Sequence, residues 1–238
     1  MSAFLYGVTL QWKLDIRKQD VIISYYLIPL VMFAVMGGIL TSIMPDMQDA
    51  IIQSMTIFGV SMGAFNGLPP SLVQIYGSDI KNVYKANGIP LSLGVITNFI
   101  SAFIHLFIMS MIIFFTAPLI FDAVHPENLP LYFGSLAIFI TSSIAIGSAL
   151  GVLIKDQAKV SMIAQLFFLP SVMLSGIMMP ANVLPSVFSY IGRAVPATWG
   201  KLLMTSDVFN LSYFIPLAIM FGIATLVCGL ALSRNVKA

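Results

Sequence analysis

Side chains that could carry out chemistry are few in this sequence and lie far apart. His105 falls inside a long apolar run and His125 falls outside any such run, so the two are not expected to share a zinc ion. Neither the phosphate-binding motif G-x-x-x-x-G-K-[ST] nor the zinc motif H-E-x-x-H occurs. A single histidine in a membrane helix more often hydrogen-bonds to a neighbouring helix than acts as a base. We therefore predict no catalytic residue, no metal site and no cofactor bound by this chain.

The composition places the chain in a membrane. Of the 238 residues, 59% are hydrophobic and only 8% are charged. Soluble domains carry about 25% charged residues, so this chain has too little polar surface for a water-soluble protein of its size. The single cysteine, Cys228, excludes an intrachain disulfide and a cysteine metal cluster.

Six apolar stretches are long enough to cross a bilayer. A span takes about 20 mostly apolar residues, and a helix satisfies its own backbone hydrogen bonds there. The six stretches are 21–44, 51–76, 91–116, 131–154, 160–179 and 211–232, and none contains Asp, Glu, Lys or Arg. The sequence therefore predicts an all-α polytopic membrane protein whose residues 1–238 form a single transmembrane domain.

The charges sort by the side of the membrane on which each connection would lie. With the N-terminus inside, the segments 1–20, 77–90, 155–159 and 233–238 carry nine of the eleven basic residues. The connections on the other side carry Asp46, Asp49, Asp122, Glu127 and Asp207 with only Arg193 and Lys201. Because short cytoplasmic loops are enriched in Lys and Arg, we expect both termini in the cytoplasm and 117–130 and 180–210 outside.

Two segments flank the spans without crossing. In residues 1–20, Leu5, Val8, Trp12 and Ile16 share one helix face opposite Lys13 and Arg17, which predicts a helix lying along the inner interface. The alternative is a frayed basic N-terminus. In residues 180–210 the apolar stripe includes Val187, Phe188 and Ile191, and it is bounded by Pro185 and Pro196. About ten residues are too few to span a bilayer, so this piece is expected to dip into the outer interface as a re-entrant hairpin.

The connection between the second and third stretches predicts a short inner helix over 78–88. Ser78 or Asp79 can cap its start, and Gly88 followed by Pro90 ends it. Its apolar patch and flanking lysines are Ile80, Val83, Tyr84, Lys81 and Lys85. Two helical turns are unstable alone in water, so we expect this helix to pack against another structure; a solvated turn is the alternative.

Small and polar residues inside the spans suggest where helices approach one another. Gly59, Gly63 and Gly67 recur at four-residue spacing in the second stretch, and Gly147 and Gly151 do so in the fourth. Such stripes allow close helix packing, either static within one bundle or at a moving or dimer-forming face. The polar residues Asn66 and Asn98 are candidates for lining a pathway, with interhelical hydrogen bonding as the alternative.

Taken together, these segments resemble the membrane subunit of a type-2 ABC exporter, the ABC-2 type transporter family. The resemblance covers the whole chain and rests most on "SDIKNVYKANGIPLS" and on "SGIMMPANVLPSVFSYIGRAVPATW". It implies a non-catalytic permease, in which 78–88 is the coupling helix and Val187, Phe188 and Ile191 belong to a roof over the outer end of the pathway. One departure is that Asp79 and two lysines stand where many relatives have an acidic residue and an arginine-rich stretch.

The same resemblance implies partners and cargo. Two such permeases, identical or different, would stand side by side in a prokaryotic plasma membrane among its lipids, with no nucleic acid involved. Two ABC ATPase subunits would bind ATP and Mg²⁺ below them. Efflux of drugs, antibiotics or lipid-like molecules is the expected activity, and spans rich in Met and Phe suit amphipathic or hydrophobic cargo.

Two other classes of protein remain as alternatives. A six-span secondary transporter or channel would work without an ATPase, but coupled transporters usually keep ionisable residues within their spans, and here His105 is alone. An intramembrane enzyme using His105 is the third interpretation. Copurification of an ATPase subunit would distinguish the first class from both others.

Overall fold

The computed structural model describes residues 3–43, 45–178 and 185–237, and its regular elements are all helices, with no strand in these ranges. In order, the elements are α1 (Ala3–Arg17), α2 (Gln19–Ile22), the π-helical turn η1 (Ile23–Leu27), α3 (Ile28–Ile43), the 3₁₀ turn η2 (Pro45–Ala50), α4 (Ile51–Met62), the π-helical turn η3 (Gly63–Gly67), α5 (Leu68–Tyr76), α6 (Ile80–Ala86), α7 (Ser92–Phe121), α8 (Leu129–Leu153), α9 (Gln157–Leu174), α10 (Ser186–Gly192), α11 (Pro196–Met204) and α12 (Leu211–Lys237). The predicted all-α class is confirmed.

Six helical segments are long and apolar enough to cross a membrane. They are Gln19–Ile43, Gln48–Tyr76, Ser92–Phe121, Leu129–Leu153, Gln157–Leu174 and Leu211–Arg234. The expected number of membrane helices is therefore confirmed. The third helix runs to Phe121, beyond the stretch 91–116, because residues 117–121 are themselves apolar apart from Pro118, which the helix accommodates.

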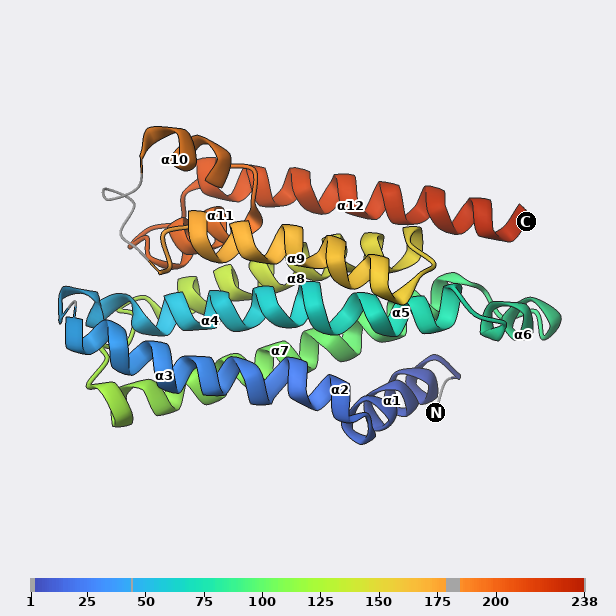
Figure 1. The fold of residues 1–238 in the computed structure, drawn as a ribbon, viewed down its shortest axis with the longest axis horizontal. Coiled ribbons are helices and arrows are strands. Elements are labelled where there is room, and N and C mark those ends of the chain that lie inside the picture. The colour runs from blue at the N-terminus through green and yellow to red at the C-terminus, as the bar shows by residue number, and fades with distance from the viewer. Residues whose placement is uncertain (1–2, 44, 179–184, 238) are drawn as a thin grey trace.

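The second membrane helix lies at the centre of the bundle. In Figure 1, α4 and α5 run between α3 on one side and α9 on the other. Within the Gln48–Tyr76 segment 89% of the most apolar window is buried, against 22% in the first and last membrane helices. The outward faces of the peripheral helices remain apolar and exposed, for example at Val35, Leu166 and Ile223, which is the surface that lipid requires.

Two π-helical turns face each other inside the bundle, and each precedes a proline. Proline lacks an N–H group and its ring clashes with the preceding turn, so a locally widened turn accommodates it. The turn η1 comes just before Pro29, and η3 comes just before Pro69. The ring of Tyr25 in η1 lies directly against Gly63 and Gly67 in η3, where an added Cβ would come within 2.7 Å of the ring.

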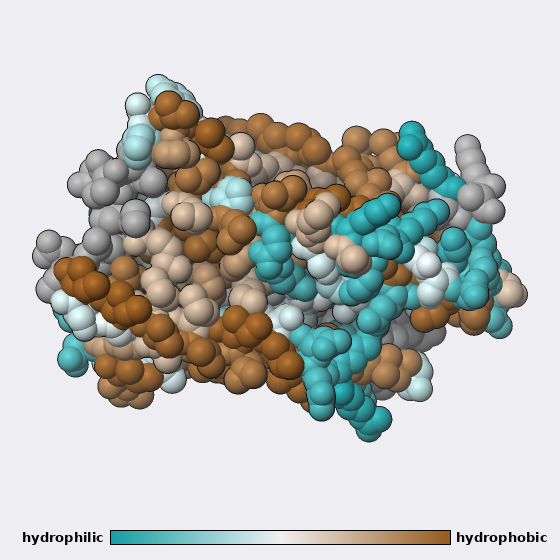
Figure 2. Space-filling model, viewed as in Figure 1, coloured by the Kyte–Doolittle hydropathy of each residue, from teal (hydrophilic) through white to brown (hydrophobic). Residues whose placement is uncertain are grey.

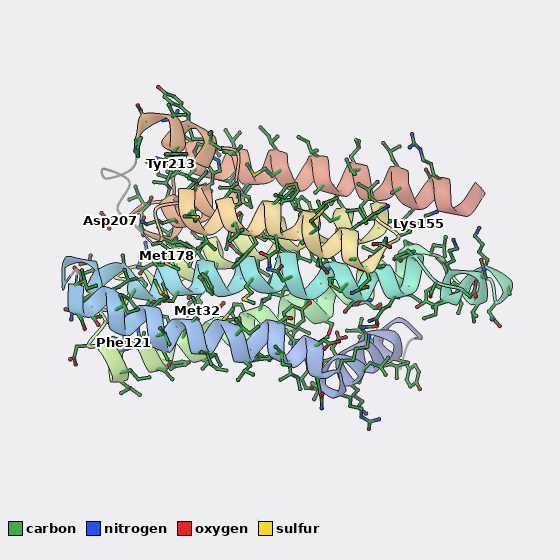
Figure 3. The ribbon with its side chains drawn as sticks, in the orientation of Figure 1. Met32, Phe121, Lys155, Met178, Asp207 and Tyr213 are labelled. Atoms are coloured by element: carbon green, nitrogen blue, oxygen red, sulfur yellow. The ribbon has the colours of Figure 1, made fainter. Side chains whose placement is uncertain are left out.

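The bundle has two chemically different ends. One, the α6 end, carries α1, α6 and the C-terminal end of α12, and the opposite α10 end carries η2, α10 and α11 (Figure 1). Hydrophilic residues gather toward the α6 end in Figure 2, while a hydrophobic surface covers much of the rest of that face. Figure 3 shows Lys155 near the α6 end and Asp207 near the α10 end. The charge separation along the sequence is therefore a separation between the two ends of the folded bundle.

The first helix packs on the bundle through a polar face. Asp15 is only 4% exposed, whereas Leu5 and Ile16 of the predicted apolar face stay exposed. The contact is made with α7, where Gln11 Nε2 donates to Asn98 Oδ1 at 3.2 Å. Helix α1 therefore contacts the bundle through these polar groups and through Trp12, and it leaves Leu5 and Ile16 exposed.

Candidate functional site

Helix α6 is the clearest isolated element at the α6 end, and local hydrogen bonds define both of its ends. Ser78 Oγ accepts from the Ile80 backbone N–H at 3.3 Å. At the other end Gly88 has a φ of +65°, and Ile89 N donates to Tyr84 O at 2.8 Å while Gly88 N donates to Lys85 O at 3.2 Å. This pair of bonds is the Schellman motif, in which a left-handed residue closes the last helical turn.

The structure divides the five residues predicted as the coupling surface into two groups. Ile80 and Val83 are 45% and 56% exposed, Lys85 is exposed beside them, and Lys81 between them is half-buried. Tyr84 instead is half-buried and packs against the core of the bundle. The exposed apolar surface of α6 is therefore the Ile80–Val83 pair, and Tyr84 attaches α6 to its own chain rather than presenting itself to a partner.

Of the two asparagines considered for a pathway, only Asn66 faces a hollow. Asn98 is buried, donates to Gly94 O at 2.8 Å and accepts from Gln11, so it serves helix packing. Asn66 lines a hollow of about 210 Å³ together with Lys18 and Gln74, and its Nδ2 is buried without a hydrogen-bond partner. Asn66 Nδ2 can therefore donate a hydrogen bond to a group in this hollow, which lies toward the α6 end of the central helix.

The glycine stripes are occupied by contacts within this one chain. A Cβ on Gly147 would lie 2.1 Å from Ala64 O, and one on Gly151 would lie 2.8 Å from Pro69 O, so α8 rests on the backbone of η3 and α5. Gly59 is covered by Met109 and Pro29. These contacts correspond to static packing within a bundle, the first of the two alternatives.

His105 is enclosed by aromatic side chains. Its Nδ1 lies 2.7 Å from Tyr26 Oη in a hydrogen bond, and its ring stacks on Tyr25 at a centroid distance of 5.6 Å. Trp12 of α1 stacks on the same imidazole at 6.1 Å. The bond to Tyr26 joins two helices, which is the usual role of a single histidine in a membrane helix.

Catalytic and metal chemistry find no support in the described residues. The letters of Gly59–Val60–Ser61–Met62–Gly63 match the nucleophile motif G-x-S-x-G, which requires a strand–turn–helix and a base. Here they form helix, and Ser61 Oγ is buried with no hydrogen-bond partner. Within the same described ranges no three His, Cys, Asp or Glu side chains are grouped closely enough to hold a metal ion.

At the α10 end, helix α10 exposes the three apolar residues predicted to line an outer gate. Val187, Phe188 and Ile191 are all exposed, and α10 contacts α9. The rest of the predicted hairpin includes residues 179–184, which lie outside the described residues. Helix α11 follows, and Lys201 Nζ donates to Gly176 O, which joins α11 to the end of α9.

Comparison with models of known protein families identifies the family of this chain. The model of the ABC-2 type transporter family matches residues 3–209, from α1 through α11. The chain belongs to the ABC-2 type transporter family. Comparison with curated proteins gave no match. As an ABC-2 protein the chain is the permease subunit of an ABC transporter, a multi-pass membrane subunit of a generally non-catalytic kind.

Membership in the ABC-2 family implies an ABC transporter assembly with ATPase subunits. Helix α12 lies beyond the matched residues, but it packs along α8 and so belongs to the same bundle. Three polar residues of this permease, the buried Asp15 and Gln53 and the half-buried Lys201, were not singled out from the sequence. For Asp15 and Lys201, the only signal in the sequence was a charged residue in a segment next to a membrane span. Gln53 gave no signal beyond its polarity.

Proposed function

We propose that this permease is the membrane part of an ATP-driven exporter and that a separate ATPase binds at α6. The observation that carries the proposal is the exposed Ile80–Val83 pair, flanked by lysines, on a helix at the end of the bundle. An apolar centre with a charged rim is the usual anatomy of a protein interface. The strong helix stop at Gly88 holds that pair in a defined position.

The other segments at the α6 end suit a docking role less well. The connection between α8 and α9 has only three residues outside the helices, and α1 uses its buried face to bind α7. Helix α6 combines exposed apolar side chains with a position at the tip of the bundle (Figure 1). With the basic α6 end in the cytoplasm, as the charge distribution favours, this tip faces the compartment that contains ATP.

The proposed cargo is amphipathic or hydrophobic, and a second permease subunit completes the pathway. Support for this cargo comes from the hollow that Asn66 shares with Lys18, which offers polar contacts beside otherwise apolar helices. Val187, Phe188 and Ile191 would form the outer gate against the second subunit, since they are exposed at the α10 end. Phe188→Asp should then stop transport while the ATPase still binds, and normal transport by this variant would exclude the gate.

The docking proposal is tested by changing only the exposed pair. Ile80→Ala with Val83→Ala should reduce pull-down of the ATPase subunit by about tenfold or more, since truncated apolar anchors often cost 2 kcal/mol or more. Lys81→Ala and Lys85→Ala should weaken binding less and make it more dependent on salt, as rim charges do. Val208→Ala is the matched control, because Val208 is also apolar and exposed but lies near the α10 end.

Three measurements are needed for each variant: ATPase pull-down, cargo-stimulated ATP hydrolysis and the melting temperature of the permease. The proposal requires loss of the first two with an unchanged melting temperature. Normal binding and coupling by the Ile80/Val83 variant would place the ATPase elsewhere. Transport that continues without any ATPase would favour a secondary transporter or channel instead.

A further inference from the structure

A hollow at the α10 end collects acidic side chains from three separate parts of the chain. It has a volume of about 280 Å³ and lies between the start of α4, the connection from α7 to α8 and the end of α11. Its polar lining comes from Asp49, Gln53, His125, Glu127, Asn128, Thr205, Ser206 and Asp207. Asp207 is marked in Figure 3 at this end of the bundle.

The charged side chains that line this hollow are all acidic. Three carboxylates line it, and no lysine or arginine is among its lining residues. Like charges gathered around a low-dielectric cleft focus a negative potential and raise the local concentration of cations. Asn128 Nδ2 donates a hydrogen bond to the backbone oxygen of Asp207 at 3.4 Å. This bond occupies one backbone acceptor beside the hollow and holds two of its walls together.

Gln53 supplies the second and independent observation. This residue lines the same hollow, is 5% exposed, and its Oε1 is buried with no hydrogen-bond partner. A buried amide oxygen without a donor costs about 1–3 kcal/mol, and such groups are rare in folded proteins. A ligand that brings N–H donors into the hollow would relieve that cost.

The carboxylates are not arranged for a metal ion. In the described part of the chain, which includes the whole lining, no three His, Cys, Asp or Glu residues come close enough to coordinate one ion. A metal ion needs ligand oxygens within about 2.0–2.6 Å of a single point. An ammonium group holds carboxylate oxygens at a longer N···O distance of about 2.7–2.9 Å, so its acceptors can stand farther apart than the ligands of a metal ion.

We propose that the hollow binds a primary ammonium group, which donates its three N–H groups to Gln53 Oε1 and to carboxylates among Asp49, Glu127 and Asp207, with any remaining carboxylate contributing charge attraction alone. This site is separate from α6 and does not depend on the proposed docking of an ATPase. A primary ammonium can come from a soluble amine in the medium or from the headgroup of an aminolipid. Both present the same charge and the same N–H donors, so they compete for one site.

The proposal is tested with spermidine as the soluble probe. The full-length permease is placed in nanodiscs of phosphatidylcholine, whose quaternary headgroup has no N–H, and spermidine binding is measured by calorimetry. Glu127→Gln, Asp207→Asn and Gln53→Leu should each weaken binding about tenfold, because the first two remove a negative charge that attracts the ammonium group and the third removes an amide oxygen acceptor. Asp122→Asn is the matched control, since Asp122 is exposed in the same connection but does not line the hollow.

Selectivity for N–H donors is tested with tetramethylammonium, which carries a positive charge without a donor. We expect it to displace spermidine only weakly. Nanodiscs containing phosphatidylethanolamine should lower the apparent affinity for spermidine in the wild type if the headgroup reaches the hollow, and should leave it unchanged if soluble amines alone do so.

Three outcomes would overturn the proposal. These are absence of spermidine binding to the wild type, equal loss of affinity in Asp122→Asn, and equal displacement by tetramethylammonium. Asp207→Asn changes an exposed side chain, so it keeps the test valid if Gln53→Leu alters the fold.

Discussion

The carboxylate of Asp15 on α1 accepts a hydrogen bond of 2.7 Å from the hydroxyl group of Ser101 on α7. Both side chains are buried, and the second oxygen of Asp15 accepts from Gln11 Nε2 at 2.8 Å. A carboxylate that is buried needs such donors, because an unpaired buried charge is strongly unfavourable. This bond is the closest polar tie between the first helix and the membrane-spanning bundle.

Removing the hydroxyl donor of Ser101 should weaken the attachment of α1 to the bundle. Ser101→Ala is expected to lower the free energy of unfolding by about 1–3 kcal/mol, because the carboxylate of Asp15 loses a partner while staying buried. The measurement is thermal unfolding in detergent, with Ser92→Ala on the exposed start of α7 as control. A double-mutant cycle with Asp15→Ala should give a coupling of at least about 0.5 kcal/mol. Additive effects would mean that the two residues do not stabilise each other.

The end of α6 should depend on glycine at position 88. Because Gly88 has a φ of +65°, Gly88→Ala is expected to cost about 1–2 kcal/mol locally. Amide hydrogen exchange in residues 84–89 should then accelerate about 5–30-fold, which is that free energy expressed as an opening equilibrium. Gly222→Ala, at a helical glycine with open space around it, should leave this exchange unchanged. Unaltered exchange in Gly88→Ala would show that the left-handed turn does not hold α6.

Close packing between α8 and η3 predicts a large effect at Gly147. An added Cβ would lie 2.1 Å from the Ala64 carbonyl oxygen, so the two helices must separate. Gly147→Ala should lower the free energy of unfolding by about 1–3 kcal/mol, as overpacking does in tight cores. Gly134→Ala on the same helix meets nothing within 4 Å and is expected to be neutral or slightly stabilising. Equal stability of the two variants would contradict this packing.

The proposed orientation is tested by labelling single cysteines on intact cells. In a Cys228→Ala background, Val208→Cys near the α10 end should react with an impermeant thiol reagent. Lys81→Cys on α6 should react only after the membrane is permeabilised, because the positively charged end is expected inside. Val208 is 73% exposed, so lack of access in the fold would not explain a negative result. The reverse labelling pattern would invert the topology.

Lys201 should make stability depend on pH in the alkaline range. Burial lowers the pKa of the Lys201 amine below its usual value of 10.5. Between the lowered pKa and the usual value, the unfolded chain binds more protons than the folded chain, so the free energy of unfolding rises with pH. The melting temperature of the wild type should therefore increase relative to Lys201→Met as the pH is raised toward the usual pKa of 10.5. A constant difference across that range would refute the burial of a charged amine.

Several features of this protein follow from its sequence alone. Six uncharged apolar stretches require six helices, because hydrocarbon leaves no other partner for the backbone. The short helix over 78–88 is signalled by Ser78, Gly88 and Pro90, whose effects on the chain are local. The family resemblance also rested on local segments, and the match to residues 3–209 agrees with it.

The roles of individual side chains depend on the tertiary structure. The spacing of apolar residues in α6 does not show which of Ile80, Val83 and Tyr84 turns toward the bundle. Because α6 packs against α5, it is Tyr84 that contacts the bundle. The sequence does not distinguish Asn66 from Asn98. In the fold, Asn98 is hydrogen-bonded to Gln11 of α1, whereas Asn66 faces a hollow. The acidic hollow likewise joins residues 49, 127 and 207 only after folding. Helix periodicity is a local property, whereas burial and hydrogen bonding depend on which distant segments meet, and that is decided by the packing of the whole bundle.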